Sequence, residues 1–175
     1  MILKPRKVKL IAGLISGNPE LFGKAAGMLE KKLANTVDFE SDTLDFGYTD
    51  YYEKEMGPAL KRKFISFKRA VALKEIEKVK LASIAIEKKL SLDNKRLINI
   101  DPGYLDLAKL VLFSTKDYSH RLHVGSGIFA EVTLYFKGGG FKAWPWTYPD
   151  YRTKGYLSIF NSIRERIKTE RAPAK

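Results

Sequence analysis

The chain has 175 residues, 45% of them hydrophobic, and its 32 Lys and Arg residues outnumber 20 Asp and Glu, giving a formal net charge of +12. The absence of cysteine excludes disulfides, thiolate nucleophiles and sulfur-ligated metals. No apolar run reaches the roughly 18 residues that a membrane helix needs, and the charged start lacks the core of a signal peptide. We therefore expect a cytoplasmic protein without a membrane partner, folded as a single domain over residues 1–170 with a frayed tail at 171–175.

The basic excess has two interpretations. Most of it is Lys that alternates with apolar residues, as on a solvated surface, and abundant Lys, Glu and Arg without Gln resembles the composition of thermophile proteins. The other interpretation is an anionic partner such as nucleic acid or a phosphorylated ligand. The acid-rich stretch 38–55 is followed by the basic run 61–63, so contact between these two segments is expected.

The first half of the chain alternates strand and helix signals. Residues 7–15 form a short apolar run typical of a buried strand. Asn18 and the Pro-Glu pair that follows it predict a helix start, with a capping side chain and Pro in the first turn. Alternation over 37–46 predicts a strand that places three acids on one face, namely Asp38, Glu40 and Asp42.

Residues 62–67 predict a strand, 73–90 a helix and 96–101 a further strand, which the turn-forming tripeptide Asp101-Pro102-Gly103 should end. The resulting βαββαβ order predicts an α+β fold with a ferredoxin-like core, in which an antiparallel sheet carries both helices on one face. Residues 105–114 are almost wholly apolar, so periodicity cannot separate helix from strand; we expect a short buried helix.

The second half predicts a β-meander over 121–144 that extends the core, followed by a terminal helix over 157–166. If 125–127 forms a three-residue loop, Arg121 lies opposite Glu131 and Val124 lies opposite Ile128. Alternate residues of that strand would then point into one core: Ile128, Ala130, Val132, Leu134 and Phe136.

Several familiar sites are disfavoured. Residues 17–25 contain a Gly-Lys pair, but five residues separate the glycines where a phosphate loop has four, and Ala25 replaces the magnesium-binding hydroxyl. An RNA-recognition sheet needs aromatics two residues apart, whereas Phe64 and Phe67 differ in parity. His120 and His123 would face opposite sides of a strand, so no metal site is predicted.

Two segments hold more polar and aromatic side chains than a fold requires. Residues 114–121 supply two cations, an acid, an imidazole and four hydroxyls. This inventory suits a phosphate or carboxylate ligand, with Lys116 as a point charge and Arg121 as a bidentate fork, although a polar loop can also satisfy its own backbone. Residues 144–152 contain two Pro and four large aromatics, which suits either a cover over a core edge or a stacking wall for a planar ligand.

The chain also resembles an uncharacterised bacterial protein family, a domain of unknown function whose members are often labelled "GTP-binding protein". The resemblance rests on Asp50-Tyr51-Tyr52-Glu53-Lys54-Glu55-Met56-Gly57, Asn99-Ile100-Asp101-Pro102-Gly103-Tyr104, Ser114-Thr115-Lys116-Asp117 with His120-Arg121, Ala130-Glu131-Val132-Thr133-Leu134, and the segment 146–152. It covers nearly the whole chain. It implies no established activity, and the failed phosphate loop argues against the GTP label.

The leading hypothesis is a pocket, built from 114–121, Glu131 and 146–152, that binds a small anionic ligand, phosphate- or nucleotide-like, with enzymatic action left open. Proton transfer would fall to Asp117, His120 and Glu131. The expected ligand-binding residues are Lys116, Arg121, Arg152, Asp101, Tyr104, Tyr52, Glu53, Asp150 and Tyr151. Two alternatives stay open: a non-enzymatic RNA-binding module that uses the basic surface, and a structural or assembly protein. The sequence identifies no cofactor.

Overall fold

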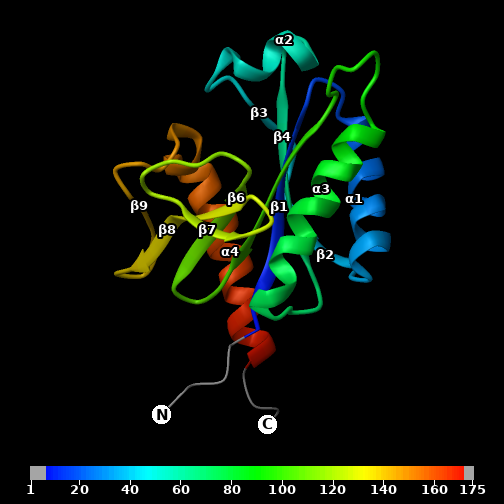
Figure 1. The fold of residues 1–175 in the computed structure, drawn as a ribbon. Coiled ribbons are helices and arrows are strands. Elements are labelled where there is room, and N and C mark those ends of the chain that lie inside the picture. The colour runs from blue at the N-terminus through cyan, green and yellow to red at the C-terminus, as the bar shows by residue number, and fades with distance from the viewer. Residues whose placement is uncertain (1–6, 172–175) are drawn as a thin grey trace.

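The computed structural model describes residues 7–171 and shows an α+β fold with one antiparallel sheet (Figure 1). Its strands are β1 (Lys9–Ser16), β2 (Val37–Glu40), β3 (Leu44–Asp45), β4 (Lys61–Phe67), β5 (Asn99–Leu105), β6 (Lys109–Ser114), β7 (Leu122–Gly125), β8 (Ile128–Lys137) and β9 (Gly140–Ala143). Its α-helices are α1 (Glu20–Leu33), α2 (Glu53–Met56), α3 (Ile76–Lys89) and α4 (Lys154–Arg171). Short 3-10 helices lie at Asp50–Tyr52, Leu73–Glu75 and Pro149–Arg152.

The strand order is β2-β4-β1-β5-β6-β8-β7, with β3 beside β4 and β9 beside β8. The order β2-β4-β1-β5, crossed by α1 and α3, is compatible with the expected ferredoxin-like core. The α+β class and the terminal helix are confirmed. The tail expected to fray from 171 lies outside the described residues, apart from Arg171, which ends α4. Every helix in the described part of the chain is too short or too polar to cross a bilayer.

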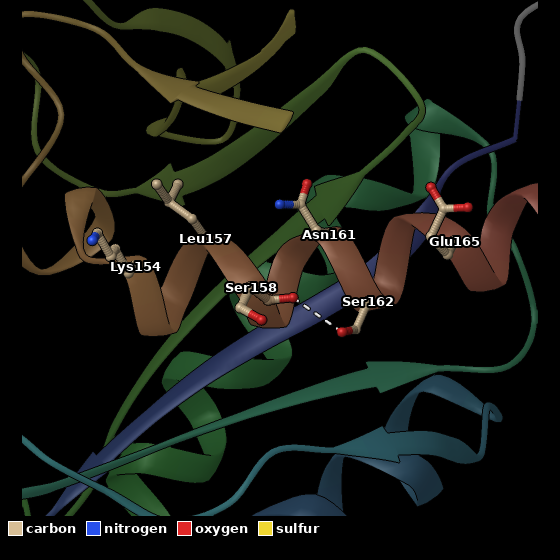
Figure 2. Close-up of a pocket in the computed structure, with 6 residues that line it drawn as sticks. All are labelled: Lys154, Leu157, Ser158, Asn161, Ser162 and Glu165. Atoms are coloured by element: carbon tan, nitrogen blue, oxygen red, sulfur yellow. Dashed lines mark hydrogen bonds between the residues drawn. The ribbon is translucent and has the colours of Figure 1, made fainter. Parts of the chain in front are cut away.

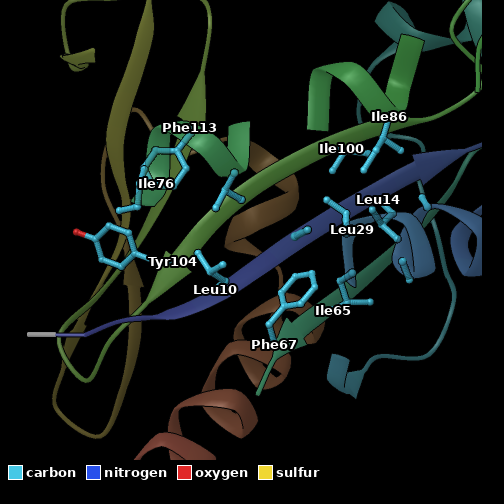
Figure 3. Packing of buried hydrophobic residues seen from close by; sticks show 14 of the residues in the cluster. Leu10, Leu14, Leu29, Ile65, Phe67, Ile76, Ile86, Ile100, Tyr104 and Phe113 are labelled. Atoms are coloured by element: carbon cyan, nitrogen blue, oxygen red, sulfur yellow. The ribbon is translucent and has the colours of Figure 1, made fainter. Parts of the chain in front are cut away.

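A hydrophobic core packs against each face of the sheet, and β1 is therefore buried along its whole length. Alternate β1 residues such as Leu10 and Leu14 pack against α1 and α3 in the first core (Figure 3). Ile11 points the other way and joins Phe64 of β4 and Phe160 of α4 in the second core. The terminal helix therefore covers the face that a two-layer ferredoxin-like core would leave open.

The helix expected within 105–114 is wrong, because these residues form the end of β5, a tight loop and β6. Asp106 makes the loop by accepting hydrogen bonds from the backbone N–H groups of Ala108 (2.7 Å) and Lys109 (2.9 Å). The segment shows no alternation because β6 is apolar on both faces: Val111 packs into the first core and Leu110 into the second.

The turn expected at 101–103 is also wrong, since β5 runs through it. β5 pairs with β6 only over Gly103–Leu105, so its first half is open on that side. There the backbone of Ile100 is capped by side chains of α3: its N–H donates to Glu87 Oε1 (2.5 Å) and its carbonyl accepts from Lys80 Nζ (3.4 Å). Pro102 faces the same open side, so its missing N–H breaks no ladder bond.

Gly103 is required where β5 and β6 meet, because a Cβ at this position would lie 2.3 Å from the carbonyl oxygen of Val111. The strand expected over 37–46 is likewise interrupted. Buried Ser41 separates β2 from β3, and a bulge lies between Val37 and Phe39. The acids of this segment consequently do not form one cluster: Asp38 pairs with Lys9 and Glu40 with Lys63.

The meander is present, but its register contains two bulges. Gly125 rather than Val124 lies opposite Ile128, so the loop has two residues, Ser126 and Gly127, both at positive φ. Further along β8 the register skips Thr133. As a result Val132 packs into the first core and Leu134 into the second. The prediction that the apolar residues of β8 share one face is therefore wrong.

Candidate functional site

The first of two clusters at one end of the sheet is built on Glu131 of β8, whose side chain is 2% exposed. Its Oε2 accepts one hydrogen bond from Arg121 Nε (2.7 Å) and lies 3.2 Å from His120 Nε2. Its Oε1 accepts from the hydroxyl of the bulged residue Thr133 (3.2 Å). The expected contact between Arg121 and Glu131 is thus confirmed. A buried carboxylate here orients an imidazole that is itself partly exposed.

Arg121 connects this cluster to the loop before it. Its Nη1 donates to Ser114 Oγ (3.1 Å) and to the carbonyl of Lys116 (2.9 Å), and its Nη2 donates to the hydroxyl of Tyr148 (3.4 Å). Although burial alone would lower the pKa of Arg121, its hydrogen bond and ion pair with Glu131 raise it overall. The guanidinium therefore stays charged and holds strand, loop and strap together, the strap being residues 144–152.

Aromatic rings continue from His120 as a column. The imidazole stacks on Trp146 on one side (ring centroids 5.8 Å apart, planes 16° apart) and on Tyr118 on the other (5.9 Å, 15°). Trp146 in turn stacks on Trp144 (5.1 Å, 8°). The strap is fixed where β8 bulges: Trp146 Nε1 donates to the carbonyl of Val132 (3.1 Å). These near-parallel planes make one ordered wall.

Lys116 stands beside this wall with its ammonium group exposed. Its Nζ lies 3.1 Å from the hydroxyl of Tyr51 and 4.5 Å from the centre of the same ring. The contact joins the loop 114–121 to the 3-10 helix before α2, so a cation is held at a defined place by a neutral partner.

The second cluster surrounds Arg62 of β4, which is 2% exposed. Its Nη1 donates to Asp101 (3.1 Å) and its Nη2 to Asp150 (3.1 Å). The guanidinium carbon lies 5.1–5.9 Å from the centres of four rings, those of Phe46, Phe64, Tyr151 and Tyr156. This cation is enclosed by carboxylates and aromatics.

Gly13 of β1 makes room for this arrangement, since a Cβ there would lie 2.9 Å from Arg62 Nη1. Burial alone would raise the pKa of Asp101, but the charges of Arg62 and Lys80 lower it below its usual range. Burial raises the pKa of Asp150 despite its bond to Arg62. The two carboxylates that share one guanidinium are therefore shifted in opposite directions.

Tyr148 and Tyr52 link the two clusters. The hydroxyl of Tyr148 is bonded to Arg121 of the first cluster. Burial raises the pKa of Tyr52, and the nearby charge of Asp101 and the phenol of Tyr148 raise it further. Most of the site residues expected from the sequence thus fall into two neighbouring groups, one around Glu131 and one around Arg62.

The remaining expected residues lie elsewhere or play other parts. Tyr104 packs with Phe113 in the first core, on the opposite face of the sheet, where burial and Asp106 raise its pKa to about 12. Arg152 donates to the carbonyls of Thr147 and Pro145 (2.7 Å each) and so braces the strap. Asp117 is exposed on the loop 114–121, and Glu53 is exposed at the start of α2.

Sequence reasoning missed Arg62 and Tyr51, and it included Tyr148 only as part of the segment 146–152. Arg62 sits between two lysines in a basic run, which hid it, yet it shares parity with Phe64 and could have been assigned to the buried face on that ground. Nothing in the sequence indicated the contact between Tyr51 and Lys116, which are 65 residues apart.

Two surface depressions are not lined by the residues of either cluster. Figure 2 shows one along the outer side of α4, lined by Lys154, Leu157, Ser158, Asn161, Ser162 and Glu165. The other lies beside the end of α3, lined by Ile84, Glu87, Lys88, Ser91, Asp93, Asn94 and Arg96. Neither contains an expected site residue. Within residues 7–171, no group of three or more His, Asp or Glu side chains is placed to hold a metal ion.

Fold and site together define an α+β protein with an enclosed arginine and with a partly exposed histidine held by a buried glutamate at one end of an antiparallel sheet. The chain belongs to the family described as Domain of unknown function (DUF4416), which matches residues 6–167. The resemblance to a family of unknown function is therefore confirmed. A comparison with curated proteins gave no match.

Proposed function

We propose that this protein binds a small anionic ligand, carrying a phosphate or carboxylate, beside Glu131 between the loop 114–121 and the strap. The observation that carries the proposal is the placement of Lys116. Its ammonium is exposed, is held by the hydroxyl and ring of Tyr51, and stands on the loop that carries His120, the partner of Glu131. A cation held by a neutral phenol keeps its charge available to an incoming anion.

The other cations act as scaffold in this proposal. Arg121 gives its N–H groups to Glu131, Ser114, Lys116 and Tyr148, so it fixes the loop. Arg152 braces the strap and Arg62 is enclosed by its carboxylates. Anion binding is therefore assigned to Lys116, with hydroxyls of the same loop as further donors.

His120 is the proposed proton carrier if the ligand is transformed. Glu131 lies against Nε2 and orients the ring, and Nδ1 is the atom that would exchange a proton with the ligand. Asp117, which is exposed on the same loop, is the second candidate for proton transfer. We also propose a cytoplasmic location, on the basis of the cysteine-free composition.

Thermal unfolding with and without phosphate-bearing metabolites tests binding, because a ligand of the native state raises its apparent stability. Wild type should gain melting temperature with at least one such ligand, and Lys116→Gln should lose most of that gain. Lys24→Gln is the matched control: it removes the same charge from an exposed site on α1 and should retain the gain. No ligand-dependent gain in wild type, or an equal gain in Lys116→Gln, would contradict the proposal.

A second candidate, single-stranded RNA binding, is favoured by one observation: the net charge of +12 accompanies exposed aromatic rings around the site. It would not use the aromatics of β4, because Phe64 and Phe67 are buried. RNA binding predicts an affinity for oligonucleotides that falls steeply with salt. A weak salt dependence together with tight binding of a single metabolite would eliminate it.

A further inference from the structure

Most of the exposed aromatic side chains lie beside the loop 114–121. Among the residues with described exposure, they are Tyr48, Tyr51, Tyr118, Trp146 and Tyr148. The other large exposed apolar side chains are aliphatic, and two of them, Leu122 and Val124, lie on β7 directly after the loop 114–121. Four of the aromatic side chains contact the loop 114–121: Tyr51 lies against Lys116, Tyr118 and Trp146 stack on His120, and Tyr148 is bonded to Arg121. Lone exposed apolar residues need no explanation, but rings grouped around one polar loop mark a binding surface.

Tyr118 is the outer ring of the column that runs through His120 and Trp146 to Trp144. It is 52% exposed, although its plane lies within 15° of the imidazole next to it. A ring that is both exposed and held in a fixed plane offers a stacking platform, because a second flat ring can lie parallel to it without ordering a mobile side chain.

One guanidinium fixes this platform relative to the proposed anion site. Arg121 donates from Nη1 to the carbonyl of Lys116 (2.9 Å), and its carbon atom Cζ lies 4.8 Å from the centre of the Tyr118 ring. The backbone of Lys116 and the ring of Tyr118 are therefore both held by the guanidinium that pairs with buried Glu131, while Tyr51 holds the ammonium of Lys116.

We infer that the ligand carries a planar heteroaromatic ring as well as its anionic group, the ring stacking on Tyr118 while the anion meets Lys116. This inference rests on the proposed function and names its ligand class. Stacking tolerates different rings because each has a π face, so the class is defined by flatness and charge rather than by one hydrogen-bonding pattern.

The test compares dissociation constants, by calorimetry, for adenosine 5′-monophosphate and ribose 5-phosphate, which share the anion and differ in the ring. Wild type should bind the nucleotide about tenfold more tightly, the order expected of one stacked base. Tyr118→Leu should remove that preference and leave ribose 5-phosphate binding unchanged, whereas Tyr118→Phe, which keeps the ring, should retain it. Melting curves without ligand check that both variants are folded.

Equal affinity for the two probes, or a preference that survives in Tyr118→Leu, would overturn the ring inference and leave the anion site standing. Failure of both probes to bind would overturn the proposed function as well. A short oligouridylate, titrated at two salt concentrations, separates the sources of the ring. Binding of the oligomer with no binding of the mononucleotide would overturn the small-ligand class in favour of RNA.

Discussion

Two arginine–carboxylate clusters lie on the same face of the sheet, and they differ in what they leave available. Around Arg62, both Asp101 and Asp150 are bonded to the guanidinium and four rings enclose it. Around Glu131, the guanidinium of Arg121 is similarly occupied, but His120 is partly exposed and Lys116 projects to solvent.

The difference suggests that one cluster stabilises the fold and the other binds a ligand. An enclosed cation with its carboxylates joins elements distant in sequence, here β4, β5 and the strap, and its loss leaves unpaired charges in the interior. An oriented histidine beside an exposed cation adds little to stability and can meet a ligand. Changes to Arg62 and its two carboxylates should therefore act on folding, and changes to His120 and Lys116 of the Glu131 cluster on binding.

The largest expected effect follows from Arg62→Met. It leaves Asp101 and Asp150 without their shared partner and should lower the free energy of unfolding by about 3–5 kcal/mol. Lys116→Met, the matched change at the exposed cluster, should cost less than about 0.5 kcal/mol. Urea denaturation of both variants measures the contrast. Equal losses in the two variants would remove the distinction between the clusters.

Gly13→Ala should give an intermediate effect. The added methyl group meets Arg62 Nη1 at 2.9 Å and a Phe64 ring carbon at 3.0 Å, so the packed guanidinium must shift at a cost of about 1–3 kcal/mol. Gly23→Ala is the control, because nothing lies within 4 Å of the new Cβ on α1 and the helix should gain about 1 kcal/mol. A Gly13→Ala variant as stable as wild type would show that Arg62 is loosely held.

A smaller effect is expected in the pH dependence. Because the folded pKa of Asp101 is lowered, its contribution to stability is complete above the ordinary Asp pKa of 3.8 and is lost as the pH falls through the lower folded value. Asp150 has the opposite sign, since its raised pKa means that ionisation on raising the pH costs stability. The stability difference between wild type and Asp101→Asn should therefore shrink below about pH 4 in urea titrations. A difference that stays constant from pH 7 to pH 3 would contradict this.

Sequence patterns predicted the elements that have one apolar face or a clear capping residue at a helix start. The helix after Asn18 begins with the expected bond, in which Asn18 Oδ1 accepts from the N–H of Glu20 (3.1 Å). Failures occurred where tertiary contacts replaced local rules. Pro102 reads as a turn residue, but it occupies an open stretch of β5 whose backbone is capped by α3 side chains. No local pattern encodes that cap.

The candidate site was predictable where its members are close in sequence. Arg121 and Glu131 are ten residues apart across one hairpin, so register arithmetic paired them even though the bulge at Val124 was not foreseen. The cluster around Arg62 joins residues 39 and 88 positions away, and parity alone cannot say which strands become neighbours. Long-range pairing therefore set the limit of the prediction.

The most direct test of the proposed site maps where an anionic ligand acts. Inorganic phosphate and adenosine 5′-monophosphate are titrated into ¹⁵N-labelled protein, and amide and His120 side-chain shifts are followed by NMR. The account predicts the largest changes over 114–121 and at Tyr51, with little change at Gly13 or Arg62. Changes centred on the α4 depression of Figure 2, or no changes at ligand concentrations in the millimolar range, would contradict it.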